Sequence, residues 1–169
     1  MTLNNDSFVK RDRLRFTKNK LSANLALSAI AFNALYFVSI YRSDVGSYYY
    51  SIMIGISVVY NLLYMLTAFL SSEGVKSYKP GYAYLLIALG AAQIVRIFIL
   101  PMRARNELVA LGTESVEVMG RGQFMWVSVC LCASAALSIA AGIIGLMKTS
   151  ALKSHQAELD KETRGAPYE

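Results

Sequence analysis

The chain has 169 residues, of which 55% are hydrophobic and 17% charged, and its formal net charge is +6. Soluble proteins carry about 25% charged residues, so this composition argues against a water-soluble domain and favours one compact membrane domain. The net charge does not indicate a nucleic-acid partner, because the basic residues flank the apolar stretches. The only histidine is His155, so we expect no metal site and no cofactor.

The N-terminal segment, residues 1–20, is polar and basic. Such a segment is typical of a flank that sets membrane topology. A short helix lying on anionic lipid headgroups is the alternative. The apolar stretch that follows is longer than a usual signal-peptide core, and we therefore expect it to be the first span.

Four stretches are long and apolar enough to cross a bilayer, which needs roughly 20 helical residues. None contains Asp or Glu, whereas proton-coupled pumps and small multidrug transporters usually keep a carboxylate in the membrane. The sequence predicts an all-α integral membrane protein, an up-and-down bundle of four transmembrane helices over residues 21–147. The expected spans are residues 21–41, 52–70, 81–100 and 124–147.

The second span carries polar residues at spacings of three and four, which place them on one helical face. In hydrocarbon this face should point into the bundle. It either forms hydrogen bonds between helices, which we favour, or lines a cavity for a small polar or amphipathic ligand. The face comprises Ser57, Tyr60, Asn61, Tyr64, Thr67 and Ser71, and the first span adds Asn24, Ser28, Asn33 and Tyr36.

The third span contains Arg96, the only formal charge within the four stretches. Gln93, Arg96 and Arg103 would share one face if the helix continues through Pro101. Arg96 lies about five residues, roughly 7 Å, from the end of the span. It could snorkel to the headgroups, pair with Asp44 or Glu107, or form a basic site for an anionic ligand or lipid.

The longest connection, residues 101–123, has no net charge and is expected to contain a short helix or a hairpin around Gly112-Thr113. Connections of this length usually have a role, so this loop is the best candidate for a surface that contacts a partner.

The fourth span is rich in small residues spaced four apart, which let helix backbones approach closely. This face indicates either a central position in the bundle or an interface with another subunit. The expected packing residues are Ser134, Ser138, Ala141, Gly142 and Gly145. The tail, residues 148–169, is expected to continue the helix for two or three turns and then fray.

The basic residues are distributed unequally about the spans. Twelve lie in the N-terminal segment, the loop after the second span and the tail, against four in the other two loops. The positive-inside rule then places both termini in the cytoplasm, and an even number of spans likewise requires both termini to lie on one side. We expect the membrane to be the plasma or inner membrane of a cell.

These patterns predict a non-catalytic accessory or scaffolding subunit of a larger membrane complex, such as a transport complex. Its partners would be membrane lipids, at the basic N-terminal segment, and other membrane subunits or further copies of itself. The alternative is a small oligomeric transporter or channel for a neutral or anionic solute, lined by the polar face of the second span and Arg96. A membrane enzyme is least favoured, because the span boundaries offer mainly Arg and Tyr; we expect no catalytic residues.

Overall fold

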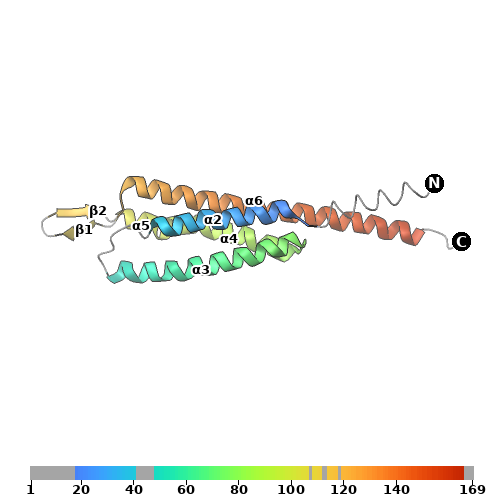
Figure 1. Ribbon diagram of the computed structural model, residues 1–169, viewed down its shortest axis with the longest axis horizontal. Coiled ribbons are helices and arrows are strands. Elements are labelled where there is room, and N and C mark those ends of the chain that lie inside the picture. Colours follow the sequence, from blue (N-terminus) through green and yellow to red (C-terminus); the bar gives the residue numbers. More distant parts are fainter. Residues whose placement is uncertain (1–17, 41–47, 107, 112–113, 118, 166–169) are drawn as a thin grey trace.

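A computed structural model describes residues 18–40, 48–106, 108–111, 114–117 and 119–165. Within these ranges the chain forms four long helices that run alternately in opposite directions (Figure 1). All four are long and apolar enough to cross a membrane, as predicted. They are α2 (Lys20–Ile40), α3 (Tyr48–Lys76), α4 (Pro80–Ile99) and α6 (Arg121–Gly165).

Each predicted span lies within one of these helices, apart from its last residue in two cases. Tyr41 is outside the described residues, and Leu100 forms the turn after α4. Of the predicted N-terminal segment, residues 1–17 are also outside the described part. The fourth helix is longer than expected, because it continues to Gly165 instead of ending two or three turns into the tail.

The connection between α4 and α6 contains both of the structures that the sequence left open. A short helix, α5 (Pro101–Asn106), is followed by strands β1 (Leu108–Leu111) and β2 (Glu114–Glu117). The strands pair antiparallel, with Leu108 opposite Glu117 and Leu111 opposite Glu114. The hairpin extends beyond the ends of the long helices (Figure 1). The long elements are therefore all helices, as the predicted all-α class requires, and the only strands in the described residues are the two short ones of this hairpin.

The bundle has two distinct ends. At the hairpin end, α2 ends, α3 begins and the hairpin β1–β2 lies; at the tail end, α2 begins and α6 continues beyond the other helices (Figure 1). At about 1.5 Å per residue, the 45 residues of α6 extend about 68 Å. A bilayer core is about 30 Å thick, so α6 is long enough to cross it and project well outside.

The turn between α3 and α4 is short because its backbone closes on itself. The amides of Ser77 and Lys79 donate to the Gly74 carbonyl at 3.2 and 3.1 Å. Tyr78 takes a φ of 58°, in the left-handed region that reverses the chain direction. Pro80 then begins α4. Proline is well tolerated there, because the first amides of a helix have no carbonyl acceptor within the helix.

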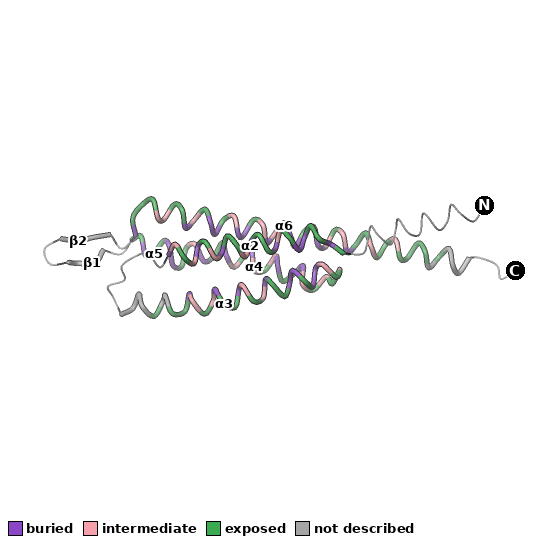
Figure 2. Tube along the Cα trace, viewed as in Figure 1, coloured by how far each residue is buried: buried purple, intermediate pink, exposed green. Residues whose placement is uncertain are grey.

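Helix α6 is the centre of the packing. It lies along α2 and α4, whereas α3 packs mainly on α2 and α4 and touches α6 at few places. Buried and exposed residues alternate along the helices as they turn (Figure 2). The buried apolar residues form two clusters. One, around Tyr36, Leu100 and Leu131, lies toward the hairpin end, and the other, around Ala83, Leu86 and Ala141, toward the tail end.

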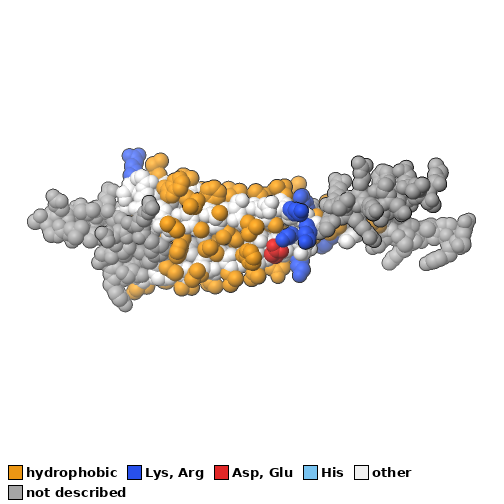
Figure 3. All heavy atoms as spheres, viewed as in Figure 1, with side chains coloured by type: hydrophobic (Ala, Val, Ile, Leu, Met, Phe, Trp, Pro, Cys, Tyr) orange, Lys and Arg blue, Asp and Glu red, His pale blue; other side chains and the backbone are white. Residues whose placement is uncertain are grey.

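The outer surface of the bundle is apolar along its middle. Hydrophobic side chains cover the visible face, and lysines gather at the tail end (Figure 3). Exposed large apolar residues on α3 include Ile56, Leu63 and Phe69. Lys18, Lys20, Lys76 and Lys79 lie at the tail-end boundary of this surface. An apolar band bounded by basic residues is what a membrane protein presents to lipid.

Candidate functional site

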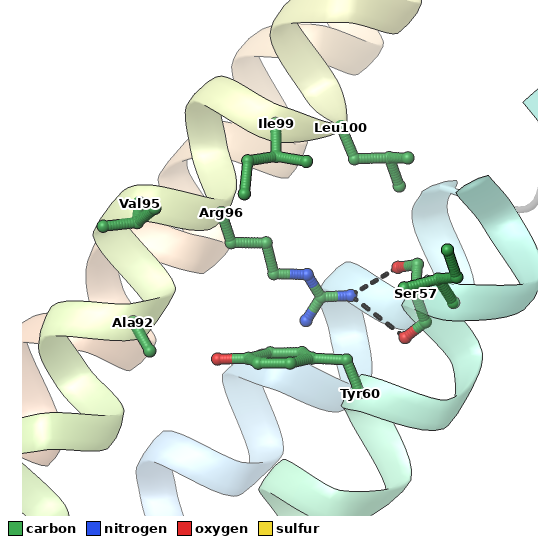
Figure 4. Close-up of a pocket in the computed structure, with 8 residues that line it drawn as sticks. Ser57, Tyr60, Ala92, Val95, Arg96, Ile99 and Leu100 are labelled. Atoms are coloured by element: carbon green, nitrogen blue, oxygen red, sulfur yellow. Dashed lines mark hydrogen bonds between the residues drawn. The ribbon is translucent and has the colours of Figure 1, made fainter.

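Arg96 is buried on the inner side of α4, with 6% of its surface exposed. Its Nη1 donates a hydrogen bond to Asn61 Oδ1 at 2.7 Å, and Nη2 donates to Ser57 Oγ at 2.6 Å. Figure 4 shows the guanidinium reaching across from α4 to Ser57 on α3. The charged group therefore points into the bundle. Asp44 and Glu107, the two ion-pair partners considered from sequence, lie outside the described residues.

Two tyrosine rings complete the surroundings of Arg96. Its Cζ atom lies 4.4 Å from the ring centroid of Tyr36 on α2 and 4.7 Å from that of Tyr60 on α3. Aromatic faces attract cations, and more strongly where water is excluded. We call Arg96, Ser57, Asn61, Tyr36 and Tyr60 the arginine cluster; it joins three helices.

A second polar contact lies one helical turn away. Gln93 Nε2 donates to Asn33 Oδ1 at 2.8 Å, and both residues are fully buried. Gln93 precedes Arg96 by three residues and Asn33 precedes Tyr36 by three, so each pair shares a helix face. The contact therefore continues the arginine cluster along the interface of α2 and α4.

Several polar atoms in this region are buried and have no hydrogen-bond partner within the described part of the chain. Unpaired polar groups are unfavourable in an apolar interior. They therefore mark places where a further hydrogen-bonding group would be stabilised. These atoms include Tyr60 Oη, Asn61 Nδ2, Asn33 Nδ2 and Gln93 Oε1.

Tyr64 connects α3 to α6 by hydrogen bonds. Its hydroxyl is hydrogen-bonded to Ser134 Oγ at 3.0 Å and to Ser138 Oγ at 2.8 Å, both on α6. Ser134 Oγ in turn donates to the Ala29 carbonyl on α2 at 2.9 Å. The polar face of the second span thus bonds to α4 through Ser57 and Asn61 and to α6 through Tyr64.

The small residues of α6 are buried in contacts with other helices of the same chain. Ser134, Ser138, Ala141, Gly142 and Gly145 are all buried. The Ala141 carbonyl accepts a hydrogen bond from Ser22 Oγ at 2.5 Å. A Cβ added at Gly142 would lie 2.6 Å from the Ala83 carbonyl oxygen, so the backbones of α4 and α6 are nearly in contact. The sequence left open whether this face lies at the centre of the bundle or forms an interface with another subunit. In the structure these five residues lie at the centre of the bundle.

Arg103 is separate from the arginine cluster. Only Leu100 separates the end of α4 at Ile99 from the start of α5 at Pro101, and the amides of Leu100 and Ala104 donate to the carbonyls of Arg96 and Leu100, so the helical path continues. Arg103 lies on α5 with an exposed side chain. The shared face predicted for Gln93, Arg96 and Arg103 therefore holds for the first two only.

A cavity of about 370 Å³ opens between α3 and α4 beside the arginine cluster. Its polar contributors are Arg96, Ser57 and Tyr60, as Figure 4 shows. Its apolar walls are Ile56, Ala92, Val95, Ile99 and Leu100. We call this cavity the Arg96 pocket.

The sequence patterns placed Ser57 and Tyr36, like Tyr60, on the polar faces of the second and first spans, but they did not predict that either residue contacts Arg96. Both carried a usable signal, since Ser57 precedes Asn61 by four residues and Tyr36 follows Asn33 by three. In the parts of the chain that the structure describes, no group of three or more His, Cys, Asp or Glu side chains could hold a metal ion.

Comparisons with protein-family models, with characterised proteins and with solved structures found no match for this chain.

Proposed function

We propose that this protein is a non-catalytic accessory or scaffolding subunit of a larger membrane complex. The observation that carries the proposal is that polar side chains of the spans bond to one another inside the bundle. Arg96 is hydrogen-bonded to Ser57 and Asn61, and Tyr64 is hydrogen-bonded to Ser134 and Ser138. Groups used in this way stabilise helix packing, and the spans contain no carboxylate that could carry a coupling proton.

A partner can bind only to surfaces that are not already buried by helix packing within the chain. The small residues of α6 are buried between α2 and α4, so they do not supply it. The hairpin β1–β2 extends past the long helices at one end, and α6 does so at the other (Figure 1). The hairpin end, whose loop has no net charge, is the docking surface that we propose for another membrane subunit or a second copy.

We infer further that the bundle spans a cell membrane, plasma or inner, with both termini in the cytoplasm. Alternating helix directions bring the start of α2 and the end of α6 to the same end of the bundle (Figure 1). In the sequence, the segment before the first span, the loop after the second span and the tail hold twelve basic residues, against four in the other two loops. The positive-inside rule therefore assigns the tail end to the cytoplasm. The basic N-terminal segment would there meet anionic lipid headgroups.

One observation favours the alternative, a small oligomeric transporter or channel for a neutral or anionic solute. The Arg96 pocket is about 370 Å³ in volume and is bordered by Tyr60, whose buried hydroxyl has no hydrogen-bond partner among the described residues. A transporter needs a site of this kind. It also needs a route to both sides of the membrane, so its path would run along the polar face of α3.

The test is purification of the C-terminally tagged chain from its source membrane in native nanodiscs, followed by mass spectrometry. We expect a larger membrane protein in stoichiometric amount. Replacing residues 108–117 by an equally long Gly/Ser segment should lower its recovery at least tenfold. The control, Lys153→Ala with Gln156→Ala on the exposed tail of α6, should not.

A chain that purifies alone, or only with copies of itself, would contradict the subunit proposal. The same preparation, reconstituted in liposomes, would then decide the alternative: solute flux that is lost in Asn61→Ala, while the bundle remains folded, would establish transport.

A further inference from the structure

We propose that the Arg96 pocket binds an anionic amphipath, with its carboxylate or phosphate group on the guanidinium of Arg96 and its hydrocarbon chain against the apolar walls. Such binding is independent of whether the protein docks to a partner subunit. It concerns a site between α3 and α4, whereas the proposed docking surface is the hairpin.

The polar part of the pocket is suited to an anion. The planar guanidinium matches the geometry of carboxylate and phosphate oxygens, and Arg96 is one of the residues that line the pocket. Tyr60 also lines the pocket, and its buried hydroxyl has no hydrogen-bond partner in the described part of the chain. An anionic group that enters beside Arg96 would meet a positive charge, and it would gain a hydroxyl donor if Tyr60 turned its buried hydroxyl toward it; Figure 4 shows these two side chains next to each other.

The walls are suited to a hydrocarbon chain. Ile56, Val95 and Ile99 line the pocket and are 61%, 57% and 48% exposed. The pocket is therefore continuous with the apolar outer surface of α3 and α4, which in a membrane faces lipid. A small water-soluble anion would have to cross hydrocarbon to reach Arg96, at high free-energy cost. An amphipath already in the bilayer can enter between the helices.

Depth and size agree with this ligand class. Arg96 lies three residues before the end of α4, about 5 Å along the helix axis. The 20 residues of α4 extend about 30 Å, the thickness of a bilayer core. Arg96 is thus within a few ångströms of the headgroup level. A volume of about 370 Å³ lies in the range of about 300–1,000 Å³ typical of small-ligand sites, and it fits a headgroup oxygen cluster with part of one chain.

Two sources could supply this chemistry: an anionic phospholipid of the bilayer or a free fatty acid. The full-length protein would be delipidated in neutral detergent and offered phosphatidylglycerol, phosphatidylcholine, oleate or inorganic phosphate, with retained ligand measured by native mass spectrometry. We expect phosphatidylglycerol or oleate to be retained at least tenfold more than phosphatidylcholine or phosphate. Preference for phosphatidylglycerol identifies a phospholipid site, and preference for oleate identifies a fatty-acid site.

Two variants and two matched controls locate the binding. Arg96→Gln removes the charge but keeps a donor for Ser57 and Asn61, and Ala92→Phe fills the pocket but keeps the charge. Each should reduce retention at least tenfold. Arg103→Gln, an exposed arginine at the same end, and Val129→Phe, on the exposed side of α6, should change it less than twofold.

Size-exclusion chromatography would confirm that each variant is folded, and Ala92→Phe tests the site even if Arg96→Gln fails to fold. Equal retention of phosphatidylglycerol and phosphatidylcholine with no retention of oleate, or full retention in Ala92→Phe, would overturn the proposal. Binding of inorganic phosphate as tightly as the amphipaths would do so as well, because the hydrocarbon chain would then contribute nothing.

Discussion

Arg96 shows how a full charge can be accommodated among the apolar helices of this protein. An arginine costs about 2.5–3.5 kcal/mol on insertion scales at the centre of a spanning helix, and less toward the end, where Arg96 lies. Here the guanidinium is compensated by hydrogen bonds to Asn61 and Ser57 and by the rings of Tyr36 and Tyr60. A lysine could not make this set of contacts, because its ammonium is compact and lacks the planar fork.

At this scale we predict strong coupling between Arg96 and Asn61. Asn61→Leu should lower the free energy of unfolding by about 1–3 kcal/mol, because a buried charged donor loses its acceptor. In the double variant Asn61→Leu/Arg96→Leu the effect should be smaller than the sum of the single effects. Unfolding in mixed micelles, followed by circular dichroism, measures both. Asn24→Leu, on the exposed side of α2, is the control; strict additivity would show that the hydrogen bond is unimportant.

At the scale of elements, the bundle depends on close approach of α4 and α6. A Cβ at Gly90 would lie 2.6 Å from Ile139 Cγ1, and one at Gly142 would lie 2.6 Å from Ile87 Cγ1 and from the Ala83 oxygen. Glycine is required at these positions because a Cβ atom would not fit between the two helices. By contrast, a Cβ at Gly55 on α3 would meet no heavy atom within 4 Å.

We therefore expect Gly142→Ala and Gly55→Ala to differ although the chemical change is the same. Gly142→Ala should destabilise the bundle by about 1–3 kcal/mol, because it forces two packed helices apart. Gly55→Ala should leave stability unchanged or raise it slightly, since alanine favours helix more than glycine does. Thermal unfolding in detergent, monitored by scanning fluorimetry, compares the two. Equal melting temperatures would mean that α4 and α6 are not tightly packed.

At the scale of the whole molecule, an apolar band separates two unlike ends. The hairpin end carries α5 and the strands, and the tail end carries the lysines near the helix ends and the projecting part of α6 (Figures 1 and 3). Four antiparallel helices force the two ends onto opposite sides of any membrane that the bundle spans. In the orientation that we propose, the tail end, with its excess of basic residues, is the cytoplasmic one.

This orientation predicts opposite labelling of two introduced cysteines. In a Cys130→Ala/Cys132→Ala background, Glu114→Cys in the hairpin should react with a membrane-impermeant maleimide in intact cells. Ser154→Cys, exposed on the tail of α6, should react only after permeabilisation. The reverse pattern would refute the inferred orientation, and labelling of both sites from one side would refute the four-span topology.

Hydropathy was sufficient to predict the four helices, because membrane crossing depends on a local sum over about 20 residues. The small residues at four-residue spacing likewise predicted a close-packing face on the fourth helix, and the polar spacing of the second span predicted a face that lies inside the bundle. The tail of α6 was underestimated, since its helix continues through polar residues to Gly165 where hydropathy carries no signal.

The direction of Arg96, the exposure of Arg103 and the neighbours of the small face became apparent only in the packed structure. The physical reason is that these features depend on how the helices are rotated and paired. Arg96 and Asn61 are 35 residues apart, and Ser22 and Ala141 are 119 apart. A pattern along one helix shows which residues share a face. Which helix that face meets, and whether a pocket remains between them, is a property of the assembled bundle.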